Sequence, residues 1–500
     1  MSDELMKREI PVRTKDELFP DYTAFVDEID KNGITPELLY KIIRRHKGNS
    51  LYNQMLYNRY LAIKDSITIH HREPRFEEDK PINNKVSNDF FGEIIDFKTG
   101  YFAGEPISYG YSKTDEAEEV TGGMEAVDEA TKTITDFVTR NNMFGVDMET
   151  TRFATIYGYA GRLFYIDTEG VERVMPVHGF ETIPLSKTNI SEPKYAVRYF
   201  KTTDIDDNEK WVVEFYDNAD VYTFEGMLSK LEWTDVQPHC FDYCPLQGIA
   251  NNEACMGDSE KVLPLIDDYD KVFSDNSNEI ESFVHAIMVV QAYLGSGEDG
   301  DKEVVKATAN GIMYVPPIGT NTASDPVKWA TKNINDAFTE HHLQRTEDNI
   351  YRFSKTPNMN DEAFGSASGV ALKFRLHPLE TKCATFEANV MDAAQHMWRV
   401  LCSSWAKRKV ILDPLQITME YHRNFPLDRL SEAQTAQALI GAGFPKEWVF
   451  SQTAGVDDVD YVMELLEKEK SEMALYTAVE NAVEEEEADE TDESGETEEE

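Results

Sequence analysis

Residues 356–373 read Thr356-Pro357-Asn358-Met359-Asn360-Asp361-Glu362-Ala363-Phe364-Gly365-Ser366-Ala367-Ser368-Gly369-Val370-Ala371-Leu372-Lys373. Pro357 ends one helical pattern, and a polar segment punctuated by Gly365 and Gly369 follows. A second helical pattern begins at Gly369 and continues to about Lys409. A flexible loop between two long helices is either a connector or a moving part, and most of the functional question depends on which.

The chain before this loop contains two helical patterns that enclose a segment of different character. The helices are predicted at residues 258–283 and 336–355, with apolar residues at three–four spacing. Residues 284–335 between them show short strand-like runs, one of which holds Trp329. The pattern predicts a compact β insert carried by two long helices.

Prolines and caps refine these helices. Asp258 is placed as the N-cap of the first, with Pro264 inside its opening turns and a kink expected there. Pro378 interrupts the helix of residues 369–409 and predicts a second kink. The apolar stripe of the first helix is expected to face the core or a neighbouring chain; it comprises Val262, Leu265, Ile266, Tyr269, Val272, Phe273 and Ile280.

The N-terminal half combines helices with alternating strands. Residues 1–30 are charged and interrupted by proline, which predicts a loosely held arm. Helices are predicted at 35–48, 51–62 and 86–97, and an antiparallel meander at 152–222.

The C-terminal part contains a strand at 417–421, a helical region that starts at Ser431, and an acidic end. Residues 480–500 carry 13 acidic and no basic residues, so the chain beyond about Val483 is expected to be disordered.

The chain is acidic throughout. Its 500 residues have a formal net charge of −44, and removing the tail leaves 80 acidic against 49 basic residues, a charge of −31. Binding to a phosphate backbone by counterion release needs clustered Lys and Arg, so a sequence-reading DNA protein is not expected. An acidic face that repels DNA or receives basic partners is open, as is a merely solubilising surface.

Cysteine usage and hydropathy indicate a reduced, cytosolic origin without a membrane segment. The five cysteines are odd in number, the N-terminus is charged, and no apolar run approaches the roughly 18 residues of a membrane span.

Catalytic and ligand motifs are weak. The glycine-punctuated loop lacks the Gly-Lys-Ser/Thr ending of a phosphate-binding loop. The segment 239–244 has one His and two Cys but no second pair at zinc-like spacing, so buried cysteines are favoured over a metal site. Adjacent His341 and His342 are interpreted as surface or helix-face residues. No cofactor or metal is predicted.

Four segments, taken in order, resemble the portal proteins of tailed bacteriophages, in the SPP1-like portal family. Asn83-Asn84-Lys85-Val86 leads to Gly100-Tyr101-Phe102-Ala103-Gly104-Glu105-Pro106-Ile107, which is similar to that family's signature. The others are Ile156-Tyr157-Gly158-Tyr159-Ala160; Asn251-Asn252 with Gly257-Asp258-Ser259-Glu260, Leu265 to Asp270 and Ser274-Asp275; and the loop that ends in Ser368-Gly369-Val370-Ala371-Leu372-Lys373. The resemblance covers about residues 35–467.

The resemblance implies an α+β, multi-domain portal fold with long kinked helices and a small β clip, assembled as a ring that is usually of twelve subunits. It maps onto the chain as an N-terminal arm (1–30), a wing (31–255), two stem helices (256–283 and 336–355) and, between them, a clip (284–335). A tunnel loop (356–368), a kinked helix with a wing strand (369–429), a crown (430–480) and an acidic tail (481–500) follow.

In function, the resemblance implies a non-enzymatic channel at one capsid vertex through which double-stranded DNA is packaged and ejected. The implied partners are the terminase large subunit, a head-completion or adaptor protein, and the major capsid and scaffolding proteins. The implied location is the virion, after assembly in the cytoplasm of a host bacterium. The alternatives are another virion structural or adaptor protein, and a metal-dependent hydrolase that uses scattered carboxylates.

The tunnel loop supplies most of the candidate site, as the resemblance implies. Its residues are Asn358, Met359, Asn360, Asp361, Glu362, Phe364, Gly365, Ser366 and Ser368. The loop acids fit a surface that lets DNA slide, whereas Met359 and Phe364 either touch the duplex or pack on the protein. Weak phosphate contacts or ion pairs with a neighbouring subunit are open for Lys328, Arg345 and Arg352.

Overall fold

The computed structural model describes residues 21–63, 83–111, 124–187, 189–203, 205–284, 287–291, 312–315, 327–330, 336–359, 369–424, 429–451 and several positions between 459 and 470. These form two compact units. The first holds the described residues up to 359 together with 375–424, and the second holds 369–374 and the residues from 429 onward. The mixture of helices and sheets confirms the α+β class.

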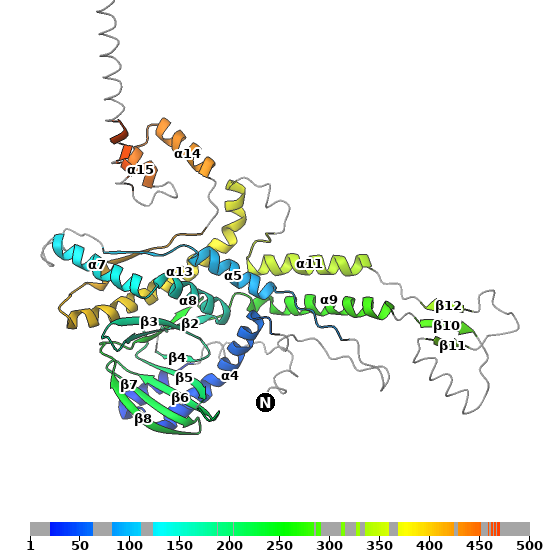
Figure 1. Cartoon of the computed structure of the whole chain (residues 1–500), viewed down its shortest axis with the longest axis horizontal. Coiled ribbons are helices and arrows are strands. Elements are labelled where there is room, and N and C mark those ends of the chain that lie inside the picture. Colours follow the sequence, from blue (N-terminus) through cyan, green and yellow to red (C-terminus); the bar gives the residue numbers. More distant parts are fainter. Residues whose placement is uncertain are drawn as a thin grey trace, which may run out of the picture. The chain divides into compact units, whose positions relative to one another are not determined.

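A five-stranded antiparallel sheet dominates one part of the first unit (Figure 1). Its strands pair in chain order: β4 (Thr182–Leu185), β5 (Tyr195–Thr203), β6 (Glu209–Tyr216), β7 (Asp220–Met227) and β8 (Lys230–Pro238). This confirms a meander, but it begins at Thr182 and continues to Pro238, and the run predicted around Leu163 pairs in a separate sheet. Helices α3 (Thr23–Asn32) and α4 (Pro36–Tyr60) bury Val26, Ile29 and Ile42 against it. We call this sheet with its two helices the sheet layer.

A second core surrounds Trp398. Here α7 (Met124–Arg140), α8 (Met143–Tyr157) and α13 (Gly369–Lys407) pack with a three-stranded sheet of β3 (Glu172–Val177), β2 (Tyr159–Ile166) and β9 (Leu246–Ala250). Strand β1 (Ser108–Tyr111), which follows α5 (Phe90–Ala103), pairs with β13 (Ile417–Glu420) after the short helix η3 (Pro414–Gln416).

Two long helices of the first unit carry the β insert. Helices α9 (Leu263–Val284) and α11 (Asp336–Ser354) lie side by side, and the three strands between them in sequence lie beyond their ends (Figure 1). Strand β10 (Ile287–Gln291) is central, parallel to β11 (Ile312–Val315) and antiparallel to β12 (Val327–Ala330). We call α9 and α11 the helix pair.

The second unit contains α14 (Arg429–Gly441) and α15 (Lys446–Ser451), which pack on each other. Within α15, Val449 is fully buried.

Several helix boundaries differ from the sequence predictions. The helices predicted at 35–48 and 51–62 are one helix, α4, because Gly48 is tolerated inside a helix whose Ile43 and Leu56 are buried. The helix predicted at 86–97 begins at Phe90, where Asp89 accepts a hydrogen bond from the Gly92 amide.

The first residues of the predicted meander are helical, because α8 continues to Tyr157. The alternation of Ile156 and Gly158 therefore spans a helix end. Residues 21–30, predicted to belong to a loose arm, instead begin the packed helix α3, whose Val26 is fully buried.

The start of α9 also differs. Asp258 does not cap it, because a short helix, η2 (Glu260–Val262), intervenes and α9 begins at Leu263. Pro264 is therefore the second residue of α9, within the first turn, where proline is tolerated because the N–H groups there have no partner within the helix. Pro378 does lie inside α13, as expected.

Candidate functional site: the helix pair and the base of the loop at 356–368

An extended segment, residues 83–88, lies along α9 and is held by polar side chains. We call it the strap. The amides of Asn84, Val86 and Asn88 donate to Asn278 Oδ1 at 2.6 Å, Ser274 Oγ at 2.9 Å and Asp270 Oδ1 at 2.8 Å. Alternate amides of an extended chain point the same way, and every fourth residue of a helix shares one face.

The buried face of α9 is consequently polar over most of its length. Asp270, Ser274 and Asn278 are at most 2% exposed, whereas Ile280 of the predicted apolar stripe is 67% exposed. Asn88 Nδ2 adds a second hydrogen bond to Asp270 at 2.9 Å. Burial raises the pKa of the Asp270 carboxyl, and the hydrogen bonds from Asn88 oppose that rise.

Two glycines bring the chain around Asp258 against the end of α8. Gly158 ends α8 with φ of 90°, and a Cβ there would lie 1.9 Å from the Cys255 carbonyl oxygen. A Cβ at Gly257 would lie 2.2 Å from the Ile156 carbonyl oxygen. This close backbone approach lets the Asp258 amide donate to Thr155 O at 2.9 Å, which fixes the position of Asp258.

Asp258 is the centre of a buried charge cluster, which we call the junction. Lys98 Nζ of α5 lies 3.3 Å and Lys382 Nζ of α13 lies 2.9 Å from Asp258 Oδ2. Asn251 Nδ2 donates to Asp258 Oδ1 at 2.8 Å, and Lys98 Nζ donates to Asn251 Oδ1 at 2.5 Å. The junction thus joins α5, α13 and the segment that leads into α9.

The pKa values within the junction follow from its burial and its charges. Burial opposes ionisation of Asp258, but the two lysines outweigh it and lower its pKa to about 2. Burial lowers the pKa of Lys98, against the attraction of Asp258, and its ammonium also lies 4.7 Å from the centroid of the Phe386 ring. Asp258 is therefore a carboxylate at neutral pH.

The loop at 356–368 leaves from the end of α11, which the junction also holds. Lys382 Nζ donates to the Ser354 carbonyl oxygen at 2.7 Å. Lys355 then adopts a left-handed conformation, with φ of 61°, and the Thr356 amide turns back to Tyr351 O at 3.2 Å. This is the geometry of a helix C-terminus, with a lysine where glycine is usual.

Only the first predicted loop residues fall within the described chain. Asn358 Nδ2 donates to Glu347 Oε1 of α11 at 3.2 Å, and the Met359 side chain is 48% exposed. The rest of the predicted loop set lies outside the described residues: Asn360, Asp361, Glu362, Phe364, Gly365, Ser366 and Ser368.

The three predicted basic contacts lie on two elements. Arg345 and Arg352 are exposed on α11, and the Arg352 guanidinium is 5.9 Å from the centroid of the Phe353 ring. Lys328 belongs to β12, opposite Val289 of β10. Their role toward phosphate stays a prediction.

The helix pair combines an excess of acidic residues with exposed apolar side chains. Helix α9 carries six acidic residues and one basic residue, and α11 carries four and two. The large apolar residues exposed there are Phe273, Ile280, Phe338 and Phe353. Between the two helices, His342 Nε2 lies 2.9 Å from Asp268 Oδ2.

Sequence reasoning missed Lys98 and Lys382 as functional residues. A signal was present, because Lys98 continues the helical spacing of the buried Ile94 and Ile95, and Lys382 is one turn after the pattern-breaking Pro378. A lysine on an apolar helix face predicts a buried partner. The partner could not be identified, because Asp258 is distant in sequence from both.

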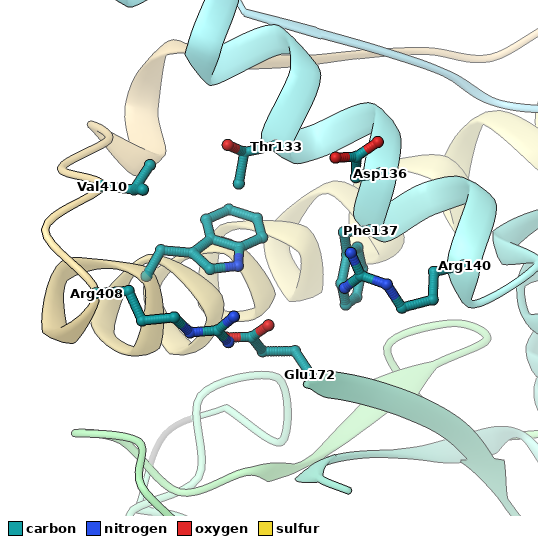
Figure 2. Close-up of a pocket in the computed structure, with 8 residues that line it drawn as sticks. Thr133, Asp136, Phe137, Arg140, Glu172, Arg408 and Val410 are labelled. Atoms are coloured by element: carbon teal, nitrogen blue, oxygen red, sulfur yellow. The ribbon is translucent and has the colours of Figure 1, made fainter. Parts of the chain in front are cut away.

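A pocket elsewhere in the first unit is lined by balanced charges. Figure 2 shows Arg408 and Glu172 directed toward each other, with Asp136 and Arg140 on α7 at the opposite side. Glu172 is 1% exposed and also accepts a hydrogen bond from Ser404 Oγ at 2.7 Å. Its buried charge is therefore matched within the protein.

The described part of the chain is not built around a metal cluster or a membrane-spanning helix. Within it, no three His, Cys, Asp or Glu side chains are grouped so as to hold a metal ion. None of its helices is long and apolar enough to cross a bilayer. The cysteines it contains are free thiols, of which Cys240 is exposed and Cys244, Cys255, Cys383 and Cys402 are buried.

The sequence is similar to those of phage portal proteins over most of its length. The family model described as "Phage portal protein, SPP1 Gp6-like" matches residues 39–474. The portal protein of Clostridium phage phiCD119 is 24% identical over 440 residues, which cover 83% of this chain and 90% of that protein. The portal protein of Bacillus phage SPP1 is 22% identical over 395 residues, which cover 74% and 70%. The chain therefore belongs to the SPP1 Gp6-like family of phage portal proteins.

Proposed function

We propose that this portal protein assembles as a ring at one capsid vertex and forms the channel through which double-stranded DNA is packaged and ejected. In this proposal the helix pair is the stem, β10–β12 the clip, the sheet layer part of the wing, and α14 and α15 part of the crown. The loop at 356–368 lines the channel. Family membership supports the portal role, and the surface of the helix pair supports the ring.

The observation that carries the ring is the exposure of large apolar side chains on the helix pair. Ile280 is 67%, Phe338 70% and Phe353 55% exposed, although α11 also buries Leu343 and Ile350. Fully burying a side chain of this size contributes about 1.5–3 kcal/mol. Neighbouring subunits of a closed ring would cover these residues, each in the same way.

The acidity of the helix pair suits a passage for DNA of any sequence. Acidic walls repel the phosphate backbone, so the duplex does not adhere, and mobile cations screen the repulsion beyond roughly 8–10 Å. The few basic side chains are Lys271, Arg345 and Arg352. They provide weak phosphate contacts or ion pairs between subunits, without the clusters that tight binding needs.

The proposed partners follow from the same assignment. The clip receives the terminase large subunit, which supplies the ATP hydrolysis, and later the head-completion or adaptor protein. The rim meets the major capsid and scaffolding proteins. The portal protein itself performs no catalysis, and it is located in the virion after assembly in the bacterial cytoplasm.

Native mass and particle images test the ring. We expect the purified full chain to form a closed oligomer, usually of twelve copies, with a central hole in negative stain. A monomer or an open chain without a hole would contradict the proposal. Divalent-metal-dependent cleavage of nucleic acid by the pure protein would instead favour a hydrolase.

Replacement of the loop tests its place in the channel. Asn358–Ser368 is exchanged for a Gly/Ser linker of the same length, so that chain length is kept while the side chains are lost. We expect rings to form normally and the amount of DNA packaged per capsid to fall. Normal filling would make the loop a connector only.

A further inference from the structure

Lys382 is bonded to two elements at once. Its ammonium donates to the Ser354 carbonyl at 2.7 Å and lies 2.9 Å from the Asp258 carboxylate. The side chain is 19% exposed, so water competes little for these contacts. One residue of α13 therefore connects the last residue of α11 to the segment that leads into α9.

The position of Ser354 makes this contact important for the loop. Its carbonyl is among the last of α11, and the last carbonyls of a helix have no intrahelical partner. A positive charge is favourable at this end of a helix. Lys355 turns in the left-handed conformation directly afterwards, and the loop begins at Thr356.

The loop returns to α13, the helix that carries Lys382. A shift of the α11 end relative to α9 would change the point and direction from which the loop departs. Asp258 opposes such a shift, because its amide is bonded to Thr155 O at 2.9 Å and its carboxylate to Asn251 Nδ2 at 2.8 Å. Through Lys382, the base of the loop is therefore tied to Asp258, whose position these hydrogen bonds fix.

We propose that Lys382 is the positioning residue of the loop at 356–368: it holds the end of α11 against Asp258 and so sets where each subunit's loop enters the channel. The proposal rests on the function proposed above for that loop. Lys382 itself touches no DNA in this role.

The junction allows Lys382 to be removed without leaving a bare charge. In Lys382→Met, Asp258 keeps Lys98 at 3.3 Å and Asn251, so its carboxylate stays neutralised. Removing Asp258 would instead leave the buried Lys98 and the partly buried Lys382 without their carboxylate. Lys382→Met is therefore the informative variant, and Lys382→Arg, which keeps charge and donors, is its rescue.

Lys407 provides a matched control on the same helix. Its ammonium also joins a carbonyl, Cys240 O at 3.0 Å, to a carboxylate, Asp242 Oδ1 at 2.8 Å. Neither partner adjoins the loop at 356–368. Lys407→Met removes the same chemistry from a different place.

The experiment measures amide hydrogen exchange at residues 351–359 in assembled full-length rings, and DNA packaged per capsid by the same variants. For Lys382→Met we expect exchange at least tenfold faster at these amides and reduced packaging. Lys382→Arg should be close to wild type, and Lys407→Met should change neither readout. If Lys382→Met does not assemble, Lys382→Gln, which keeps a donor, replaces it.

Each other outcome overturns a defined statement. Unchanged exchange in Lys382→Met would show that Lys382 does not hold the α11 end. Faster exchange with normal packaging, while the loop replacement still impairs packaging, would refute Lys382 as the positioning residue and leave the loop's function standing. If the loop replacement also packages normally, the proposed function of the loop fails, and the positioning role fails with it.

Discussion

The sheet layer and the helix pair differ in the kind of side chain that they bury. In the sheet layer, Phe215, Phe224 and Leu231 are at most 7% exposed. In the helix pair, the buried face of α9 is polar while Phe273 and Ile280 face outward. The sheet layer packs these side chains within one chain, although Met227 and Trp233 stay exposed on it. The exposed residues of the helix pair suit the ring proposed above, in which another copy would cover them.

The difference also concerns charge. In the second core, outside the sheet layer, Arg162 of β2 and Asp147 of α8 form a buried pair 2.6 Å apart, and Tyr109 adds a hydrogen bond to the same carboxylate. At the base of the helix pair, Asp258 is shared by two lysines from two helices. One arrangement stabilises a core, and the other fastens separate helices to one point. Four predictions test this contrast.

The largest effect is expected in the core. Arg162→Met leaves Asp147 buried without its cation and should lower the free energy of unfolding by about 3–5 kcal/mol. Chemical denaturation measures the change. Lys201→Met, which breaks the exposed pair with Glu209, is the control and should cost at most about 1 kcal/mol. Equal effects would remove the distinction between core and surface pairs.

On the helix pair, the expected effect is on assembly. Ile280→Ser with Phe353→Ser should change the unfolding of the isolated chain by roughly 0.5 kcal/mol or less, because both residues are exposed there. Rings should dissociate, as followed by native mass against concentration, since each side chain loses about 1.5–3 kcal/mol of burial. Met227→Ser with Trp233→Ser, exposed on the sheet layer, is the control. Intact rings would argue against the stem assignment.

Acid should weaken the junction. The pKa of Asp258 is about 2 in the folded chain, below its ordinary value, so its contribution is present above pH 4 and is lost as the pH falls toward 2. The contribution is on the order of 2 kcal/mol. Burial instead raises the pKa of Asp147, whose contribution has the opposite sign.

The measurement is the unfolding free energy between pH 5 and pH 2. Asp258→Asn should flatten the wild-type slope by up to one proton, as well as lowering stability at pH 5. An unchanged slope would show that Asp258 is not held as an ion by the lysines.

The smallest effect is expected at the helix ends. Lys355 after α11 and Lys409 after α13 both have left-handed backbones, with φ of 61° and 71°. Glycine adopts this conformation without steric cost, so Lys355→Gly and Lys409→Gly should each stabilise the chain by up to about 1 kcal/mol. Thermal unfolding checks both. Destabilisation at Lys355 alone would reveal a side-chain role at the loop base.

The sequence was sufficient for elements that are defined locally. The β insert between two helices and the strands β5 and β6 were predictable, because each has its own periodicity and turns. The helix start at Leu263 was not, because an aspartate before a helical pattern looks the same whether it caps the helix or is buried, as Asp258 is. Its role depends on Lys98 and Lys382, which the fold brings together.

The strap was hidden for a related reason. Asp270, Ser274 and Asn278 share a helix face that the sequence alone assigns to solvent, and their partners are backbone amides, which leave no mark in a sequence. The resemblance singled out residues on both sides, Asn84 and Ser274 among them, without indicating that they touch.

The strap and α9 have repeat lengths that nearly match. Four residues of helix advance about 6.0 Å and two residues of strand about 6.6 Å, so the side chains along α9 and the amides along the strap are almost equally spaced. The difference of about 0.6 Å per step accumulates in both directions from the central pair, Val86 and Ser274. Soon beyond the three paired amides, it would make the donor–acceptor distance too long for a hydrogen bond. The fit is thus finite in length and fixed in register. Inserting one residue into the strap would turn the amides beyond it away from the helix, and their hydrogen bonds to α9 would be lost.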